Sequence, residues 1–116
     1  MSTESFITMV DKPIDMTSSD CVVTLRRHLG IKKVGHGGTL DPFASGLLPV
    51  FFGQFTKLAS LFHQAQKEYV ATVQLGSQTD TGDLTGKVVK TSRYHSPSPM
   101  QCQLLERQLL GKVRLR

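Results

Sequence analysis

Apolar side chains recur along the first half of the chain with a period that changes from two residues to three or four. The stretch from Phe6 to Val10 runs into Asp11-Lys12-Pro13 and predicts a short strand followed by a loop. A helix is predicted next, because apolar residues recur at helical spacing. These residues are Val22, Leu25 and Leu29. Thr17 or Ser18 is a candidate N-cap with Asp20 placed for a capping box, and Gly30 is a helix stop.

Further elements follow from the same reasoning. Residues 35–42 contain three glycines and a proline and predict a loop. Leu47 to Phe52 is an apolar run that predicts a buried strand. Gln54 to Gln64 predicts a helix whose apolar positions face inward. Those positions are Phe55, Leu58 and Phe62.

Apolar and polar residues follow a less regular pattern in the second half of the chain. Lys67 to Leu75 has the period of a strand, Thr79 to Gly86 is polar and predicts a loop, and Lys87 to Thr91 predicts a short strand. Ser98 and Pro99 are placed to open a helix that ends at Gly111. Two leucines of this helix are spaced for burial, Leu105 and Leu109. The residues after the helix, Lys112 to Arg116, alternate like the start of a strand.

Composition narrows the class of protein. A length of 116 residues fits one domain or a piece of one, and 39% apolar with 20% charged residues indicates a soluble globular chain. The longest apolar run is too short to span a bilayer, and the N-terminus shows no secretory signal. Cys21 and Cys102 are isolated, which fits a reduced, cytoplasmic protein. We therefore expect no membrane association.

Charge indicates a class of partner. The net charge of +5 and the pI near 9.5 favour phosphate-rich partners. Four cations cluster at the end of the predicted helix: Arg26, Arg27, Lys32 and Lys33. They either complement the helix dipole or contact RNA, and both interpretations stay open.

Only residues 35–42 combine a constrained backbone with side chains that could take part in catalysis. This Gly-rich segment presents one imidazole, His36, and one carboxylate, Asp41, immediately before a proline. It lacks the Gly-Lys-Ser/Thr ending of a phosphate-binding P-loop. The four histidines and two cysteines are scattered without metal-ligand spacing, so no metal site is predicted. A lone aspartate in a turn is more often a cap than a catalyst, and spacing alone does not change that.

The same segment resembles a known family. The motif G-H-x-G-x-L-D-P-x-A-x-G-x-L-P of TruB/dyskerin-type RNA pseudouridine synthases is matched at every fixed position from Gly35 to Pro49. Further family blocks follow the family order. They are Lys12-Pro13 with Thr17-Ser18, Thr56-Lys57, Lys67-x-Tyr69, and Leu75-Gly76-x-x-Thr79-Asp80-Thr81-x-Asp83-x-x-Gly86.

The resemblance implies an isomerase that converts uridine to pseudouridine in RNA, with no cofactor and no metal. The bacterial branch, which acts on position 55 in the T-arm loop of tRNA, is the most similar. We expect tRNA, through its T-arm stem-loop, as the partner of a monomer. The target uridine would be flipped into a pocket. An alternative is a truncated fragment that binds RNA without catalysis, and a further alternative is an unrelated phosphate-binding module.

The resemblance also assigns roles to residues. Asp41 would be the catalytic nucleophile or base, and His36 would lie beside the flipped nucleotide or hold the loop. Tyr69 would stack on the target base, although a strand tyrosine is often plain core. Three lysines would order the loop or contact phosphate: Lys12, Lys57 and Lys67. Gly35, Gly38, Pro42 and Asp83 would support the site. Cys21 and Met100 are predicted to be core residues.

The expected fold follows from the family. It is α+β, with an antiparallel-rich mixed sheet and packed helices, of which residues 1–116 would form the N-terminal half of the catalytic domain. Asp15 stands where the family usually has glycine, and Gly37 where threonine is common. The family continues into a Tyr-Ser-Ala-Lys block, a basic partner for the catalytic aspartate and often a PUA domain, which residues 1–116 do not contain.

Overall fold

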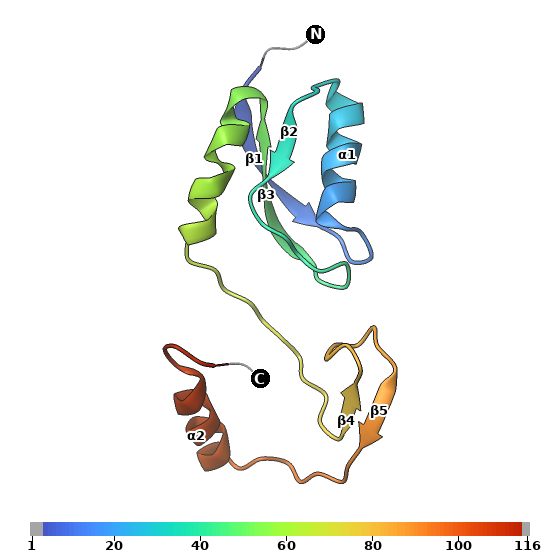
Figure 1. Ribbon diagram of the computed structural model, residues 1–116, viewed down its shortest axis with the longest axis vertical. Coiled ribbons are helices and arrows are strands. Elements are labelled where there is room, and N and C mark those ends of the chain that lie inside the picture. The colour runs from blue at the N-terminus through green and yellow to red at the C-terminus, as the bar shows by residue number, and fades with distance from the viewer. Residues whose placement is uncertain (1–3, 115–116) are drawn as a thin grey trace. The chain divides into compact units, whose positions relative to one another are not determined.

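The computed structural model describes residues 4–114, whose contacts divide into two compact units, residues 1–68 and 69–116. The first unit contains β1 (Phe6–Lys12), α1 (Ser18–Leu29), β2 (Val34–His36), β3 (Gly46–Phe52) and the 3₁₀ helix η1 (Gly53–Gln64). The second contains β4 (Ser77–Thr79), β5 (Val88–Thr91) and α2 (Pro99–Leu109) (Figure 1). Helices and antiparallel sheets together confirm the α+β class.

The sheet of the first unit has the order β1-β3-β2, and both strand pairs are antiparallel. α1 covers one face and η1 lies against the other (Figure 1). Neighbouring residues of β3 serve the two faces, because side chains alternate along a strand. Phe52 belongs to the α1 side, whereas Phe51 meets Phe62 of η1 edge to face at 5.0 Å between ring centroids.

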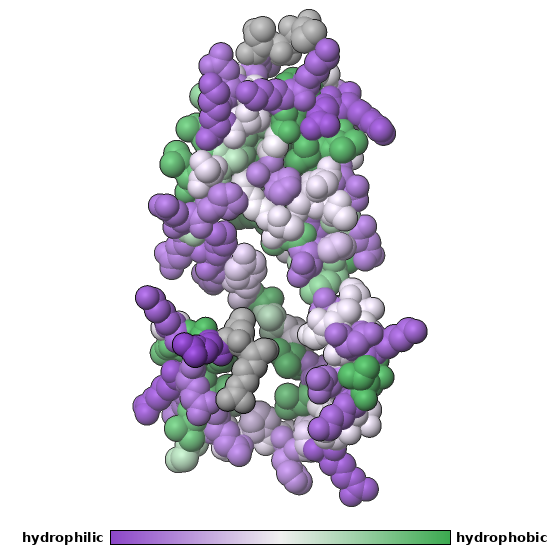
Figure 2. Space-filling view, in the orientation of Figure 1, coloured by the Kyte–Doolittle hydropathy of each residue, from purple (hydrophilic) through white to green (hydrophobic). Residues whose placement is uncertain are grey.

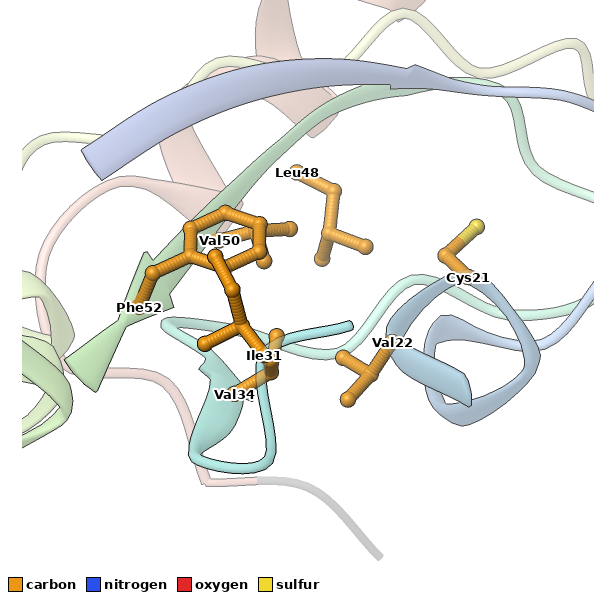
Figure 3. Packing of buried hydrophobic residues seen from close by; sticks show 7 residues of the cluster. All are labelled: Cys21, Val22, Ile31, Val34, Leu48, Val50 and Phe52. Atoms are coloured by element: carbon orange, nitrogen blue, oxygen red, sulfur yellow. The ribbon is translucent and has the colours of Figure 1, made fainter. Parts of the chain in front are cut away.

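The hydrophobic core lies between the sheet and α1. Its members come from α1, β2, β3 and the loop before β2: Cys21, Val22, Ile31, Val34, Leu48, Val50 and Phe52 (Figure 3). Phe6 of β1 stacks on Phe52 at 4.2 Å between ring centroids. The prediction that Cys21 is a core residue is therefore confirmed. Nonpolar burial of this kind supplies most of the free energy of folding.

The ends of α1 follow the sequence closely. Thr17 is the N-cap, and its hydroxyl accepts a hydrogen bond from the Asp20 backbone while the Asp20 carboxylate accepts one from the Thr17 backbone. Gly30 is left-handed, at φ 64°, and its N–H donates to the Arg26 carbonyl. The predicted helix, its capping box and its glycine stop are all confirmed.

Residues 35–42 were predicted to be a loop throughout, and this is wrong at its start. Gly35 and His36 belong to β2, where they pair with Phe51 and Val50 of β3. The pairing supplies backbone hydrogen bonds to these residues. A loop prediction based on three nearby glycines does not take such pairing into account. The loop proper begins at Gly37.

The helix predicted at residues 54–64 exists, but it is the 3₁₀ helix η1. A 3₁₀ helix has three residues per turn, so residues three apart share a face and the α-helical spacing used for the prediction does not apply. Leu58 and Phe62 are half-buried as expected, whereas Phe55 is 41% exposed and does not face inward.

The second unit departs further from the predictions. Lys67 to Leu75 forms no strand, because no other segment of the described chain pairs with it. β4 and β5 instead make an antiparallel hairpin with an irregularity between Gln78 and Thr79. β5 matches the strand predicted at Lys87 to Thr91. Residues 112–114 form no strand, and residues 115–116 lie outside the described residues.

α2 begins as predicted, with a capping box between Ser98 and Gln101 and with Pro99 in the first turn. Its predicted inward residues, Leu105 and Leu109, are exposed. Met100, expected in the core, is 70% exposed. Helical periodicity finds an apolar stripe but does not supply the element that covers it, and residues 69–114 contain no buried side chain.

The surface carries apolar and hydrophilic side chains side by side (Figure 2). Among residues 4–114 no helix is long and apolar enough to cross a membrane. In the same residues no group of three histidine, cysteine, aspartate or glutamate side chains is arranged to hold a metal ion.

Candidate functional site

The loop between β2 and β3 displays Asp41 to solvent. The residue is exposed, and its backbone carbonyl accepts a hydrogen bond from the Ala44 N–H at 2.9 Å, which closes a tight turn over Pro42 and Phe43. Within residues 4–114, no donor forms a hydrogen bond to the Asp41 carboxylate. The arrangement leaves both carboxylate oxygens free to meet a ligand.

Lys12 holds the residue that follows Asp41. Its side chain is fully buried, and Nζ donates to the carbonyls of Met16 at 2.7 Å, Pro13 at 2.9 Å and Pro42 at 3.5 Å. An ammonium has three protons, and three carbonyl acceptors compensate its loss of water. Of the two roles predicted for Lys12, the structure supports loop ordering. Phosphate contact is contradicted, because a fully buried ammonium offers no surface to a phosphate.

A second hydrogen bond reaches the same carbonyl. The Asp15 N–H donates to the Pro42 carbonyl at 2.6 Å. Asp15 has φ 67°, and it is the one non-glycine residue with positive φ among those described. The left-handed region favours glycine, because a Cβ atom crowds the following carbonyl there. The turn from Pro13 to Met16 therefore forms with Asp15 in the place where the resembled family usually has glycine.

Ser18 holds the residue that precedes Asp41. Its Oγ accepts the Leu40 N–H at 3.0 Å and donates to the Leu40 carbonyl at 3.3 Å. Ser18 is 3% exposed, so these bonds replace water on a buried hydroxyl. Asp41 is thus fixed on both sides, through Leu40 by α1 and through Pro42 by the end of β1 and the turn after it.

The role of Ser18 was missed at the sequence level, where Thr17 and Ser18 were interchangeable cap candidates. A usable signal was present. Ser18, Cys21 and Val22 are spaced at i, i+3 and i+4, which puts the serine on the buried face of α1. A hydroxyl on a buried face needs a hydrogen-bond partner, and Thr17 already supplies the cap.

His36 and the glycines of the motif take different positions. His36 lies in β2 opposite Val50, and its Nδ1 is buried without a hydrogen-bond partner in the described structure. A Cβ on Gly37 would lie 2.6 Å from the Phe51 ring, so packing requires glycine there. A Cβ on Gly35 or Gly38 would meet nothing within 4 Å, which leaves open space above the backbone at both positions.

The other predicted binding residues are exposed. Lys57 lies on η1, and Lys67 follows it with its Nζ donating to the His63 carbonyl at 3.1 Å. Tyr69 is 68% exposed and lies in an irregular segment, so the alternative of a strand tyrosine in the core is wrong. Tyr69 and Asp83 belong to the second unit, whereas Asp41 belongs to the first.

Asp83 orders the turn between β4 and β5. Its Oδ1 accepts hydrogen bonds from the Thr85 hydroxyl at 2.6 Å, the Thr81 hydroxyl at 2.8 Å and the Thr85 N–H at 2.9 Å. The Thr85 side chain is the largest cause, followed by Thr81 and then the Thr85 backbone, of a pKa below the ordinary value of 3.8 for this carboxyl. Gly86 packs against Thr81 and Asp80, which leaves no room for a side chain.

Comparison with known proteins identifies the family. Residues 26–115 match the model of the N-terminal domain of TruB family pseudouridylate synthases, and this match covers well over half of the chain. The chain belongs to the TruB family. The matched range includes the Asp41 loop and runs through both units.

Curated relatives agree. The chain is 46% identical over 91 residues to tRNA pseudouridine synthase B of Lactobacillus gasseri, 57% over 82 residues to that of Caldicellulosiruptor saccharolyticus and 46% over 105 residues to that of Geotalea uraniireducens. These alignments cover 78%, 71% and 90% of this chain but 31%, 28% and 34% of the relatives. The chain therefore spans about a third of the length of the curated TruB relatives that it matches.

A solved structure is also similar over part of the chain. It is titled as an H/ACA RNP bound to a substrate RNA containing 2′-deoxyuridine. The similarity covers 47% of this chain and 17% of that one, at 40% identity and a TM-score of 0.47.

Proposed function

We propose that the chain supplies the aspartate-bearing part of a tRNA pseudouridine synthase that isomerises uridine to pseudouridine in the T-arm loop. The observation that carries the proposal is the TruB family match over a loop in which Asp41 is exposed and both neighbours are fixed by hydrogen bonds. Fixed neighbours hold a reactive group in position before substrate arrives, which lowers the entropic cost of reaching the transition state.

The proposed reaction needs few groups. The bond from ribose C1′ to uracil N1 breaks, a bond from C1′ to C5 forms, the C5 proton leaves to water and N1 gains a proton. Asp41 acts on the flipped nucleotide as nucleophile or base. His36, Lys57, Lys67 and Tyr69 are proposed to contact the RNA, while Lys12, Gly35, Gly38, Pro42 and Asp83 support the site. We also propose that the protein acts as a monomer in the cytoplasm. The free thiols of Cys21 and Cys102 are compatible with that compartment.

Tritium release tests this proposal. The chain is incubated with a T-arm stem-loop that carries [5-³H]uridine, and tritiated water is measured. Asp41→Asn should lower release by at least about 100-fold, because the amide neither attacks nor accepts a proton. Asp11→Asn, a matched exposed carboxylate on β1, should leave release unchanged. Measurable release that is equal for wild type and Asp41→Asn would refute the assignment of Asp41.

A second candidate is RNA binding without turnover. One observation favours it: within residues 4–114 the Asp41 carboxylate has no hydrogen-bond partner. A catalytic carboxylate is usually oriented by a neighbouring group. RNA binding measured by fluorescence anisotropy, with no tritium release by the wild-type chain, would establish this candidate in place of the isomerase.

A further inference from the structure

Four cations form a surface at the end of α1 that lies away from the Asp41 loop. Arg26 and Arg27 occupy the last turn of the helix, and Lys32 and Lys33 follow in the segment leading to β2. All four side chains are exposed. Hydrophilic side chains project from this end of the first unit (Figure 2). We call these four residues the α1-end basic surface.

The positive charge of this surface is local. Residues 1–68 carry seven lysines and arginines against six aspartates and glutamates, a difference of one. Four of the seven cations belong to the α1-end basic surface, and residues 21–40 contain no acidic residue. No acidic residue therefore lies among the immediate sequence neighbours of the surface.

The backbone beneath the surface is firmly placed. Ile31 and Val34, on either side of the two lysines, are core residues. The Lys33 carbonyl accepts the Gly53 N–H at 2.8 Å, and Arg26 Nη2 donates to the Val34 carbonyl at 3.5 Å. Cations on a fixed backbone lose less conformational entropy on binding than cations on a flexible tail.

The helix dipole explains only part of the cluster. Arg26 and Arg27 lie within the last turn of α1, where a cation stabilises the helix. Lys32 and Lys33 lie beyond Gly30, which already ends the helix through its bond to the Arg26 carbonyl. The dipole decays within one turn, so it does not account for the two lysines.

The opposite end of α1 is acidic. Asp20 is part of the N-terminal cap, Asp15 bonds to Pro42 through its backbone, and Asp41 follows Leu40, which Ser18 holds. A polynucleotide that brings a uridine to Asp41 meets like charge there, so its affinity must come from elsewhere. α1 has 12 residues and is about 18 Å long, roughly five base-pair steps of a duplex (Figure 1).

We infer that the α1-end basic surface binds backbone phosphates of the RNA, several nucleotides away from the uridine that meets Asp41. The inference rests on the proposed function, since it takes RNA as the ligand. Phosphate contacts of this kind position a nucleic acid and contribute affinity without reading its sequence.

Salt-dependent binding tests the inference. Binding of the whole chain to a fluorescent T-arm stem-loop is measured by anisotropy at several salt concentrations. The quadruple variant R26A/R27A/K32A/K33A should bind more weakly, and its slope of log K against log salt should fall by about 1 for each lost phosphate contact. The control K87A/K90A/R93A/K112A removes the same charge from exposed positions in the second unit, taking the net charge from +5 to +1 in both variants. Circular dichroism confirms that both variants fold.

The outcomes separate the inference from the proposed function. A smaller slope in the quadruple variant but not in the control supports the inference, even if the wild-type chain releases no tritium. Equal slopes in the quadruple variant and the control overturn the inference, while tritium release by the wild-type chain would leave the proposed function standing. Absence of any RNA binding by the wild-type chain overturns both.

Discussion

The left-handed backbone at Asp15 has a cost that a single substitution can remove. For a residue with a side chain, this conformation costs about 1 kcal/mol, while the extra freedom of glycine in the unfolded chain costs roughly 0.5 kcal/mol. Asp15→Gly should therefore raise the free energy of unfolding by about 0.5 kcal/mol, measured by urea denaturation. The structure thus gives a physical reason for the glycine usual at this position in the family.

Asp11→Gly is the matched control for this prediction. Asp11 lies in β1, where φ is not positive, and glycine in a strand weakens it by roughly 0.5–1 kcal/mol. Destabilisation of similar size by both substitutions would show that the backbone at Asp15 carries no strain.

Ser18 gives a second prediction at the scale of one residue. Ser18→Ala leaves the Leu40 N–H without its partner in a buried setting, which should lower the free energy of unfolding by about 1–3 kcal/mol. Ser19→Ala, in the same first turn but exposed, should change it by less than about 0.5 kcal/mol. Urea denaturation of the two variants measures the difference. Equal midpoints would mean that the hydrogen bond to Leu40 contributes nothing to the free energy of unfolding.

At the scale of elements, the β4–β5 turn should respond to acid. The pKa of Asp83 is lower in the folded chain than its ordinary value of 3.8. Its stabilising contribution is therefore complete above about pH 3.8 and is lost as the pH falls through the lower folded-state pKa. Thr85→Val removes the hydroxyl that is the largest cause of the shift, so the Asp83 pKa should rise.

Carbon-13 NMR titration of the Asp83 carboxyl measures this change. Thr85→Ser keeps the hydroxyl and should titrate close to wild type. Identical titration midpoints for Thr85→Val and Thr85→Ser would show that the Thr85 hydroxyl does not hold the carboxylate.

Elements with strong local signals were predicted well. α1 and α2 carry their own capping residues, and the β1 and β3 strands carry apolar runs, so each was placed within about one or two residues. The segment from Lys67 to Leu75 alternates like a strand but forms none, because a strand requires a partner and local sequence does not specify one. Phe55 is 41% exposed for a related reason, because the spacing of apolar residues along a helix does not specify the neighbours that would cover each of them.

At the scale of the whole molecule, the two units should differ in stability. Every core residue lies in the first unit, whereas residues 69–114 bury no side chain. A fragment of residues 1–68 should unfold cooperatively in urea, and a fragment of residues 69–116 should not, because hydrophobic burial drives cooperative folding. The full chain provides the reference transition.

Circular dichroism of the two fragments makes the comparison. A sharp transition in residues 69–116 alone would show that the second unit has a core of its own. Loss of the transition in residues 1–68 would show that the first unit depends on the rest of the chain.

The sequence by itself determined the family, the α+β class, the capped helices and the presence of Asp41 in a constrained loop, because these depend on motifs and on neighbours within a few residues. Tertiary structure decided that Lys12 is buried beneath Pro42, that Ser18 holds Leu40 and that Gly37 meets Phe51. The reason is that these contacts join residues 14 to 30 positions apart, and only the pairing of β1, β2 and β3 and the packing of α1 against them bring these residues together.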